Sequence, residues 1–279
     1  IHYKKEFESS IETQLEDCRE EILLFLNNIE KISIDGLASE QISYSRIRLI
    51  ENDLTYIQIR DKVWRIETLE DYLPSGLQDV SKVEKESFNI TVAFQDDLSD
   101  KYYKLFNYFP TKLSIYLPCI IHATFELNSS RDYINASLKN EFIFEQLVEL
   151  LKKCSLNLVE ETEGKADWSP FKLLLPLTST TDSPLIDTFY SNLKKLHDEL
   201  KVFPCVDGRY ESLRSIKYYD AGFSEWVTNN EFAEQFHSLL SPLEETIGKS
   251  FPVGIRSYPQ NEFISIIDNV SNRINDLKV

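Results

Sequence analysis

The residues best placed to do chemistry lie in one turn, ELNSSRDYINASLKNE, at positions 126–141. An apolar stretch ends before this turn and a helical pattern follows it, with Arg131 as the one basic residue between positions 128 and 137. A guanidinium stays charged and presents a planar fork of donors that suits phosphate. Backbone N–H groups ahead of a helix, and the positive end of its dipole, also attract anions. Because Asn135 can add a second donor, the turn predicts an anion contact.

The alternative role for Arg131 is structural. In this interpretation Arg131 is a surface residue that pairs with Asp132 or caps nearby backbone carbonyls. Composition by itself favours this second interpretation over the first.

Other catalytic patterns are missing from the sequence. Seven scattered glycines build neither a Walker-type loop nor a dinucleotide-binding fingerprint. No serine lies in a nucleophile-elbow pattern. Paired carboxylates such as Glu160–Glu161 and Glu244–Glu245 are typical of solvated faces in so acidic a chain. A hydrolytic site within this sequence is therefore not expected.

The histidines are isolated from one another in the sequence. Cys119 and His122 stand three residues apart in a strand-like stretch, where side chains at that spacing point to opposite faces. We expect His122 to be a core histidine with satisfied hydrogen bonds. His197 and His237 fall in helical patterns and are expected to be solvated.

Charge and cysteine usage limit the class of protein. The 279 residues include 46 acidic and 30 basic ones, and the net charge of -16 repels phosphate backbones, so nucleic acid is not expected as a main partner. The four cysteines lack metal-ligand spacing, which predicts no metal site and a reduced, cytoplasmic protein. No apolar stretch is long enough to span a bilayer, and no signal peptide is visible.

The sequence contains no methionine and does not begin with one. A chain of this length normally holds several methionines. We expect it to be a fragment of a longer protein, with methionines replaced or missing from the recorded sequence.

The first half of the chain combines one helix with several strands. Helical spacing of apolar residues covers 9–29, with Ser9 and Glu12 as a capping box. The runs at 42–53, 54–60 and 62–68 predict an antiparallel meander, and 87–94 alternates through Phe88, Ile90, Val92 and Phe94. Residues 69–86 are expected to be a loop, and 105–111 an aromatic turn.

The most apolar stretch, 113–127, predicts a central strand that Pro118 interrupts early. A strong helix is expected at 138–154, capped by Asn135 or Ser137. Its buried stripe comprises Ile143, Leu147, Leu150, Leu151 and Cys154.

The second half is expected to be smaller and richer in helix. Residues 160–184 form the best candidate boundary, with a possible strand at 172–177. A helix at 185–201, a hairpin turning at Asp207–Gly208 and two helices near 223–240 and 260–277 complete the prediction.

SSRDYINASLKNEFIFEQLVELLKK, at 129–153, resembles the catalytic loop and following helix in the middle domain of the heat-shock-ninety-kilodalton chaperones. That family has a serine-arginine-acid turn after an apolar strand, a polar amide four positions later, and then a long helix. Arg131 matches the arginine, Asp132 the acid, and Asn135 stands where the family has glutamine.

Three stretches together are similar to a sacsin-like branch of the same GHKL ATPase superfamily. They are ILLFLNNIEKISI at 22–34, YFPTKLSIYLPCIIHATFELNSSRDYIN at 108–135 and VFPCVDGRYESL at 202–213. In topoisomerase and mismatch-repair relatives, a lysine of the second domain contacts phosphate, and Lys112 in FPTKL stands in a comparable place. The alternative for Lys112 is a surface lysine.

The resemblance implies one catalytic arm of an ATPase without its nucleotide pocket. ATP and Mg would be held by an N-terminal domain absent from this chain, and Arg131 would reach the γ-phosphate. The expected fold is α/β (α+β): a middle-type domain with a mixed sheet at 1–159 and a smaller α/β or helical subdomain at 160–279.

The expected function follows from that arrangement. ATP hydrolysis would drive clamp closure on a protein client, with a homodimer as a possible assembly and no enzymatic activity in this chain alone. One alternative is a non-catalytic interaction or assembly module in which Arg131 is structural. Another is part of a nucleic-acid-linked ATPase of repair or defence, which the net charge disfavours.

Overall fold

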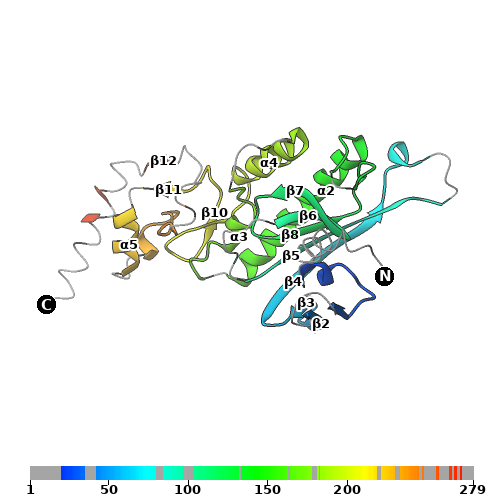
Figure 1. Ribbon diagram of the computed structural model, residues 1–279. Helices are drawn as coiled ribbons and strands as arrows, with labels where there is room; N and C mark the ends of the chain where they lie inside the picture. The colour runs from blue at the N-terminus through cyan, green and yellow to red at the C-terminus, as the bar shows by residue number, and fades with distance from the viewer. Residues whose placement is uncertain are drawn as a thin grey trace. The chain divides into compact units, whose positions relative to one another are not determined.

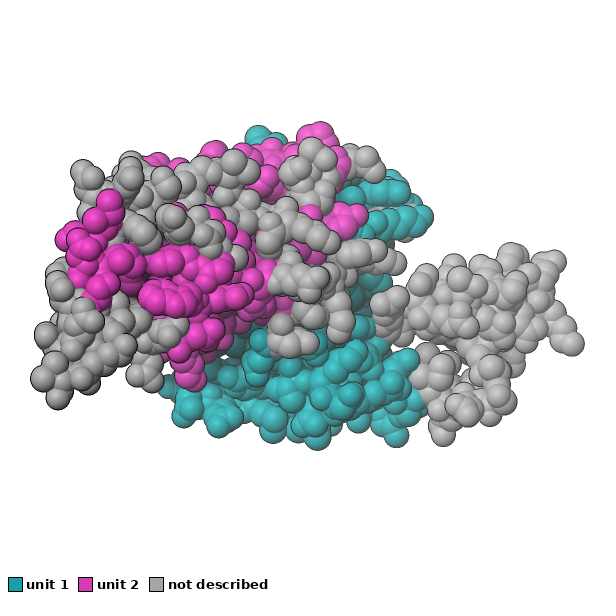
Figure 2. All heavy atoms as spheres, turned by 90° about the vertical axis from the view of Figure 1, so that its left-hand side faces the viewer, with its two compact units in different colours: residues 1–97, 102–115, 119–143 teal, residues 98–101, 116–118, 144–279 magenta. Residues whose placement is uncertain are grey.

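In the computed structural model (Figure 1) the chain forms two compact units, which Figure 2 colours separately. Unit 1 comprises Ile1–Asp97, Tyr102–Ile115 and Cys119–Ile143, and unit 2 comprises Leu98–Lys101, Tyr116–Pro118 and Phe144–Val279. The structure describes residues 20–34, 42–79, 84–96, 98, 103–131, 133–162, 164–177, 181, 183–218, 221–229, 233–244, 247, 256–257, 264–265, 267–268 and 271.

Unit 1 is built on a mixed sheet of eight strands, in the order β1-β2-β3-β4-β5-β8-β6-β7. The strands are β1 (Lys31–Ile34), β2 (Ile42–Glu51), β3 (Leu54–Ile59), β4 (Lys62–Tyr72), β5 (Ser87–Phe94), β6 (Tyr103–Asn107), β7 (Phe109–Ile115) and β8 (Ile120–Ala123). All neighbours are antiparallel except β6 and β8, which are parallel. The predicted mixed α/β class is therefore confirmed.

The predicted meander is confirmed as β2, β3 and β4, because short polar turns join three runs of alternating side chains. β4 continues to Tyr72, so the prediction that a loop starts at residue 69 is wrong at its beginning. Residues 69–72 pair with Ser87–Ile90 of β5, and this long pairing overrides their charged character.

The apolar stretch at 113–127 contributes the end of β7 and all of β8, separated by a break around Pro118. β8 lies between β5 and β6, and its four residues are all buried. It is therefore a short central strand, as the continuous apolar run predicts.

One apolar cluster of unit 1 lies on the sheet face opposite the buried side chains Phe88, Ile90 and Val92 of β5. The 3-10 helix η2 (Glu20–Leu24) covers this part of the face with its own apolar side chains. The cluster consists of Ile22, Leu23, Leu24, Phe25, Ile57, Ile59, Trp64, Ala93, Phe106 and Ile120. The prediction of a helix at 9–29 is wrong at its C-terminal end, because the described residues there form only the 3-10 helix η2. Residues 9–19 lie outside the described part.

Helix α2 (Leu138–Glu161) follows the turn that contains Arg131. Its predicted stripe is confirmed, since all five residues are at most 4 % exposed. Ser137 caps the first turn, where its Oγ accepts a hydrogen bond of 3.3 Å from the backbone N–H of Asn140. The boundary between the units falls within α2, at Ile143 and Phe144, and the division at 159/160 stays a prediction.

Unit 2 contains the rest of α2 and several shorter elements. They are α3 (Ser169–Lys172), α4 (Pro184–His197), β9 (Phe203–Pro204), β10 (Tyr210–Glu211), β11 (Lys217–Tyr218), α5 (Ala221–Asn229), the 3-10 helix η4 (Ala233–Gln235) and β12 (Arg256–Ser257). The 3-10 helix η3 (Ser75–Leu77) belongs to unit 1. The predicted hairpin is confirmed as β9 and β10. None of the described helices is both long enough and apolar enough to cross a bilayer.

Two predictions for unit 2 are wrong. Residues 172–177 form no strand; Leu173, Leu174 and Leu175 are buried in a turn that follows α3, so their apolar character reflects burial. The helix expected at 223–240 ends at Asn229, and Phe236 and Leu239 pack in the core beyond it. Most of 260–277 lies outside the described residues.

Two glycines meet where the hairpin turn touches the end of α2. Gly164 N–H donates to the Gly208 carbonyl over 3.1 Å, and both glycines have positive φ angles of 82° and 77°. A Cβ on Gly208 would lie 2.9 Å from the backbone of Gly164. The contact therefore requires glycine at position 208 for space and for backbone conformation.

We expect Gly208→Ala to lower the free energy of unfolding by about 1–3 kcal/mol, because the added methyl group meets backbone and the αL conformation becomes strained. Urea denaturation measures the loss. Gly76→Ala is the matched control, since nothing lies within 4 Å of its added Cβ. Equal effects of the two substitutions would contradict this account of the contact.

His197 is the last residue of α4 and is only 2 % exposed, so the prediction that it is solvated is wrong. Its ring packs on Phe171 with centroids 5.0 Å apart, and its Nε2 lies 3.2 Å from the Leu174 carbonyl oxygen. Burial lowers the pKa of His197 to about 4. His237 is exposed as predicted, at 69 % of its side chain, although it follows η4 instead of lying in a helix.

In the unfolded chain His197 binds a proton as the pH falls below 6.5, whereas in the folded chain its pKa is about 4. We therefore expect stability to fall as the pH drops through this window, with His197 contributing up to about 1.4 kcal/mol per pH unit. Urea denaturation at pH 7 and pH 5 should show a smaller loss in His197→Gln. An unchanged pH dependence in His197→Gln would disprove the assignment.

Candidate functional site

The turn that carries Arg131 is a small, hydrogen-bonded loop between β8 and α2. Leu127 and Ile134 form an isolated antiparallel bridge across its base. The backbone N–H of Asn128 donates to the Tyr133 carbonyl over 2.9 Å, and the N–H of Asn135 donates to Glu126 over the same distance. The loop therefore continues the extended chain outward and returns it to the start of the helix.

Asn128 organises the tip of this loop. Its side-chain oxygen accepts hydrogen bonds from Ser130 Oγ at 3.1 Å and from the N–H of Tyr133 at 3.3 Å. Its carbonyl accepts the N–H of Arg131 at 2.9 Å, which closes a four-residue turn. These contacts fix the backbone on both sides of Arg131.

Arg131 itself has a φ angle of 61° and an exposed side chain. A non-glycine residue with positive φ is uncommon and is held there only by surrounding contacts. No described residue forms an ion pair or a side-chain hydrogen bond with its guanidinium, and Asp132 lies outside the described residues. Arg131 therefore presents a charged fork of donors at the tip of a braced loop.

Asn140, in the first turn of α2, joins the base of the loop to the helix. It is fully buried, and its Nδ2 donates to the carbonyls of Glu126 and Asn135, each at 2.8 Å. Its Oδ1 accepts the Glu126 N–H at 2.8 Å. Three hydrogen bonds from one amide thus hold both ends of the loop, a role that the sequence analysis did not find.

The other two candidate residues are not at the tip. Asn135 uses its side-chain N–H to donate to the Leu127 carbonyl at 3.1 Å, so it helps to close the base of the loop. Lys112 is exposed on β7, an edge strand separated from β8 by β6. The structure therefore brings Asn135 into the same loop as Arg131 and places Lys112 on a different element.

We expect Asn140→Ala to lower the free energy of unfolding by about 1–3 kcal/mol, because it removes three part-buried hydrogen bonds and takes the Asn140 partner from the Glu126 N–H and the Asn135 carbonyl. Hydrogen exchange should also become faster at 126–135, where the loop loses its anchor. The partly exposed Asn157, on the same helix, is the matched control. Unchanged protection of the loop in Asn140→Ala would show that its amide does not brace it.

The cysteines offer no nucleophile among the described residues. Cys119, Cys154 and Cys205 are buried, as their apolar surroundings predict, and form no disulfide within the described part of the chain; Cys18 lies outside it. Burial raises the pKa of Cys205 to about 12, so its thiol stays protonated. The described side chains include no cluster of three or more His, Cys, Asp or Glu residues suited to a metal ion.

His122 differs from the prediction. It is 4 % exposed, which confirms burial, but neither ring nitrogen has a hydrogen-bond partner among the residues that the structure describes. The ring stacks on Phe25 with centroids 5.1 Å apart and meets the edge of Tyr108 at 4.9 Å. Burial lowers the pKa of His122 to about 4. The expectation of a satisfied core histidine is therefore wrong.

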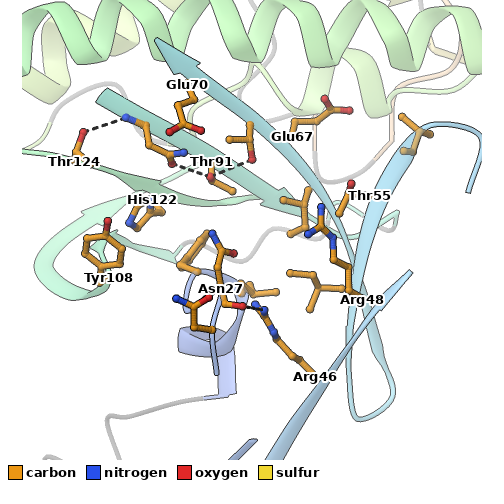
Figure 3. A pocket seen from close by; sticks show the side chains of 18 of the residues that line it. Asn27, Arg46, Arg48, Thr55, Glu67, Glu70, Thr91, Tyr108, His122 and Thr124 are labelled. Carbon is orange, nitrogen blue, oxygen red and sulfur yellow. Dashed lines mark hydrogen bonds between the residues drawn. The ribbon is translucent and has the colours of Figure 1, made fainter. Parts of the chain in front are cut away.

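His122 lines a cavity of about 820 Å³ in unit 1 (Figure 3). The polar lining residues include Asn27, Asn28, Arg46, Arg48, Asp53, Thr55, Glu67, Thr68, Glu70, Ser87, Asn89, Thr91, Tyr108, His122 and Thr124. The alternation in SFNITVAF could have indicated it, since Ser87, Asn89 and Thr91 share the face opposite Phe88, Ile90 and Val92.

Comparisons with known proteins add no identification: no family model, curated protein or solved structure matches this chain.

Proposed function

We propose that this chain is the middle region of a sacsin-like, heat-shock-ninety-type ATPase, and that Arg131 supplies a charge to the γ-phosphate of ATP. In this proposal the nucleotide and its magnesium ion are held by an N-terminal domain of the same protein. The chain contributes the arm and transmits the state of the nucleotide to a protein client.

The observation that carries the proposal is that Arg131 extends an exposed side chain from a backbone held by hydrogen bonds. Its side chain is exposed and has no described partner, while the backbone beneath it is fixed by Asn128 and, through the base of the loop, by Asn140. An arginine that only held the turn together would donate hydrogen bonds to nearby carbonyls or carboxylates. A braced turn with an unused guanidinium favours a contact outside this chain.

The chemistry of such a contact is electrostatic. During hydrolysis, water attacks the γ-phosphorus, the bond to the bridging oxygen breaks, and ADP and phosphate leave. Negative charge spreads over the oxygens of the transferring group, and a fixed guanidinium stabilises it without reorganisation. An arginine supplied in this way is worth about a thousandfold or more in rate.

In this proposal the loop supplies one contact to the phosphate, through Arg131. Arg131 is one cation on a rigid turn, and Asn135, the second donor suggested by the resemblance, is engaged with Leu127 through one of its two amide hydrogens. The proposed role of Asn135 is consequently to hold the loop closed beside the phosphate. Lys112 enters the proposal only as a further phosphate contact from another strand.

We expect Arg131→Ala in the full-length protein to reduce ATP turnover by about a thousandfold while leaving ATP affinity within a few-fold, because the arginine acts on charge that develops in the transition state. Steady-state ATPase assays and nucleotide titrations on both proteins measure the two quantities. Arg131→Lys should recover little activity, since a lysine does not reproduce the planar fork.

Arg214→Ala is the matched control, because Arg214 is also exposed and its partner among the described residues is Asp198, on the surface. It should leave turnover unchanged. Normal turnover in Arg131→Ala would remove the proposal, and so would a full-length protein that binds no ATP.

The second candidate is a non-catalytic interaction or assembly module. The observation that favours it is a pair of exposed apolar side chains on one face of β2, Ile47 and Leu49 at 56 % and 43 % exposure, with Ile50 at 70 % on the opposite face. Such residues are typical of surfaces that pack on a partner protein. In that case Arg131→Ala leaves any activity of the full-length protein intact, whereas charged substitutions on β2 abolish assembly.

A further inference from the structure

Helix η2 covers part of one face of the sheet. Along the strands this face changes from apolar to polar. Under η2 it is apolar, through Ile57, Trp64 and Ile120. Beyond η2 it becomes polar, because the pairs Thr68↔Thr91 and Thr91↔His122 place hydroxyl groups and the imidazole on the same face. Figure 3 shows Thr91 and His122 among the side chains that line the cavity.

The polar part of this face, the floor of the cavity, is organised by its own hydrogen bonds. Thr68 and Thr91 have their hydroxyl oxygens 3.2 Å apart, and Thr91 donates to Asn89 Oδ1 at 3.2 Å. The backbone N–H of Asn89 donates to Thr124 Oγ1 at 3.2 Å. The hydroxyl groups are therefore oriented in advance, and each retains capacity for a further partner.

One wall of the cavity is fixed as well. Arg46 donates to the carbonyls of Leu23 and Asn27, at 3.0 and 2.5 Å, and ties the segment after η2 to β2. Figure 3 shows Arg46 and Asn27 on this side, and His122 beside Tyr108 on another. The cavity therefore lies between elements of unit 1 that hydrogen bonds hold in place.

The buried imidazole of His122, which has no hydrogen-bond partner among the described residues, distinguishes this cavity from an ordinary solvated face of a sheet. A buried polar group without a partner costs stability, and leucine in its place would avoid that cost. Its imidazole lies at the border between the apolar core and the polar floor, under Phe25 and Tyr108. Of the two rings against the imidazole, Phe25 is 5 % exposed and Tyr108 is 49 % exposed, so Tyr108 covers it from the solvent side.

The charges of the lining point to a neutral ligand. Arg46 is occupied by two carbonyls, and Glu67 pairs with Arg65 at 3.0 Å. The remaining charged side chains of the lining, Arg48, Asp53 and Glu70, have mixed signs. No single charge dominates, whereas hydroxyl and amide groups, which both donate and accept, are numerous.

We propose that this cavity binds a small neutral molecule rich in hydroxyl groups, such as a mono- or disaccharide. Its hydroxyls bond to the row formed by Thr68, Thr91 and Asn89, and one of them pairs with His122 after Tyr108 turns aside. The volume of about 820 Å³ lies within the usual range for small-molecule sites. This site is separate from Arg131 and does not depend on any ATPase activity.

The test is an NMR titration of the full chain with glucose, galactose, mannose, maltose and trehalose, each raised to about 100 mM so that millimolar affinities are detected. We expect at least one sugar to give a saturable shift of the His122 ring and the Thr91 methyl signals. Thr91→Val removes one hydroxyl with little change in shape and should weaken that sugar about tenfold or more. Thr188→Val, on α4, is the matched control and should bind as the wild type.

His122→Leu provides an independent readout. We expect it to unfold at the same or a higher urea concentration than the wild type, yet to bind the sugar at least about tenfold more weakly. If no sugar saturates, the proposal is overturned. It is also overturned if Thr91→Val and His122→Leu both bind as the wild type, or if only phosphate or glutamate binds at these residues.

Discussion

The pairing of β8 with β5 on one side and β6 on the other is the constraint on which unit 1 depends. β8 has only four residues, all buried, and it can lie in the middle of the sheet because it pairs with β5 along its whole length and with β6 at Ile121 and His122. Its register places His122 on the face that includes Thr91, and its end delivers the chain into the Arg131 loop. Both candidate sites therefore depend on the same short strand.

Asparagine amides stabilise much of the polar structure around that strand. Asn128 closes the tip of the loop, Asn140 holds its base, and Asn89 orients the hydroxyl groups of the cavity. One amide offers two donors and an oxygen with two acceptor sites without carrying charge, so it satisfies several backbone groups at once. This arrangement leaves the guanidinium of Arg131 without a described partner, as a contact outside the chain requires.

The two buried histidines illustrate different solutions to the cost of burial. His197 bonds to the Leu174 carbonyl and packs among aromatic rings, so its neutral form is accommodated. His122 has aromatic neighbours but no hydrogen-bond partner among the described residues, and it lies where the apolar core meets a polar cavity. The contrast within one chain is what makes His122 a candidate ligand contact instead of an ordinary core residue.

The sequence by itself determined the mixed class, the β2–β3–β4 meander, β5, the long helix with its buried stripe and the hairpin at Asp207–Gly208, because these follow from local periodicity and turn chemistry. It also singled out Arg131 in its turn. It did not determine that β8 inserts between β5 and β6, that His197 is buried, or that Asn140 braces the loop. Only the tertiary structure decided these points, since burial and hydrogen-bond partners depend on which segments distant in sequence meet in space.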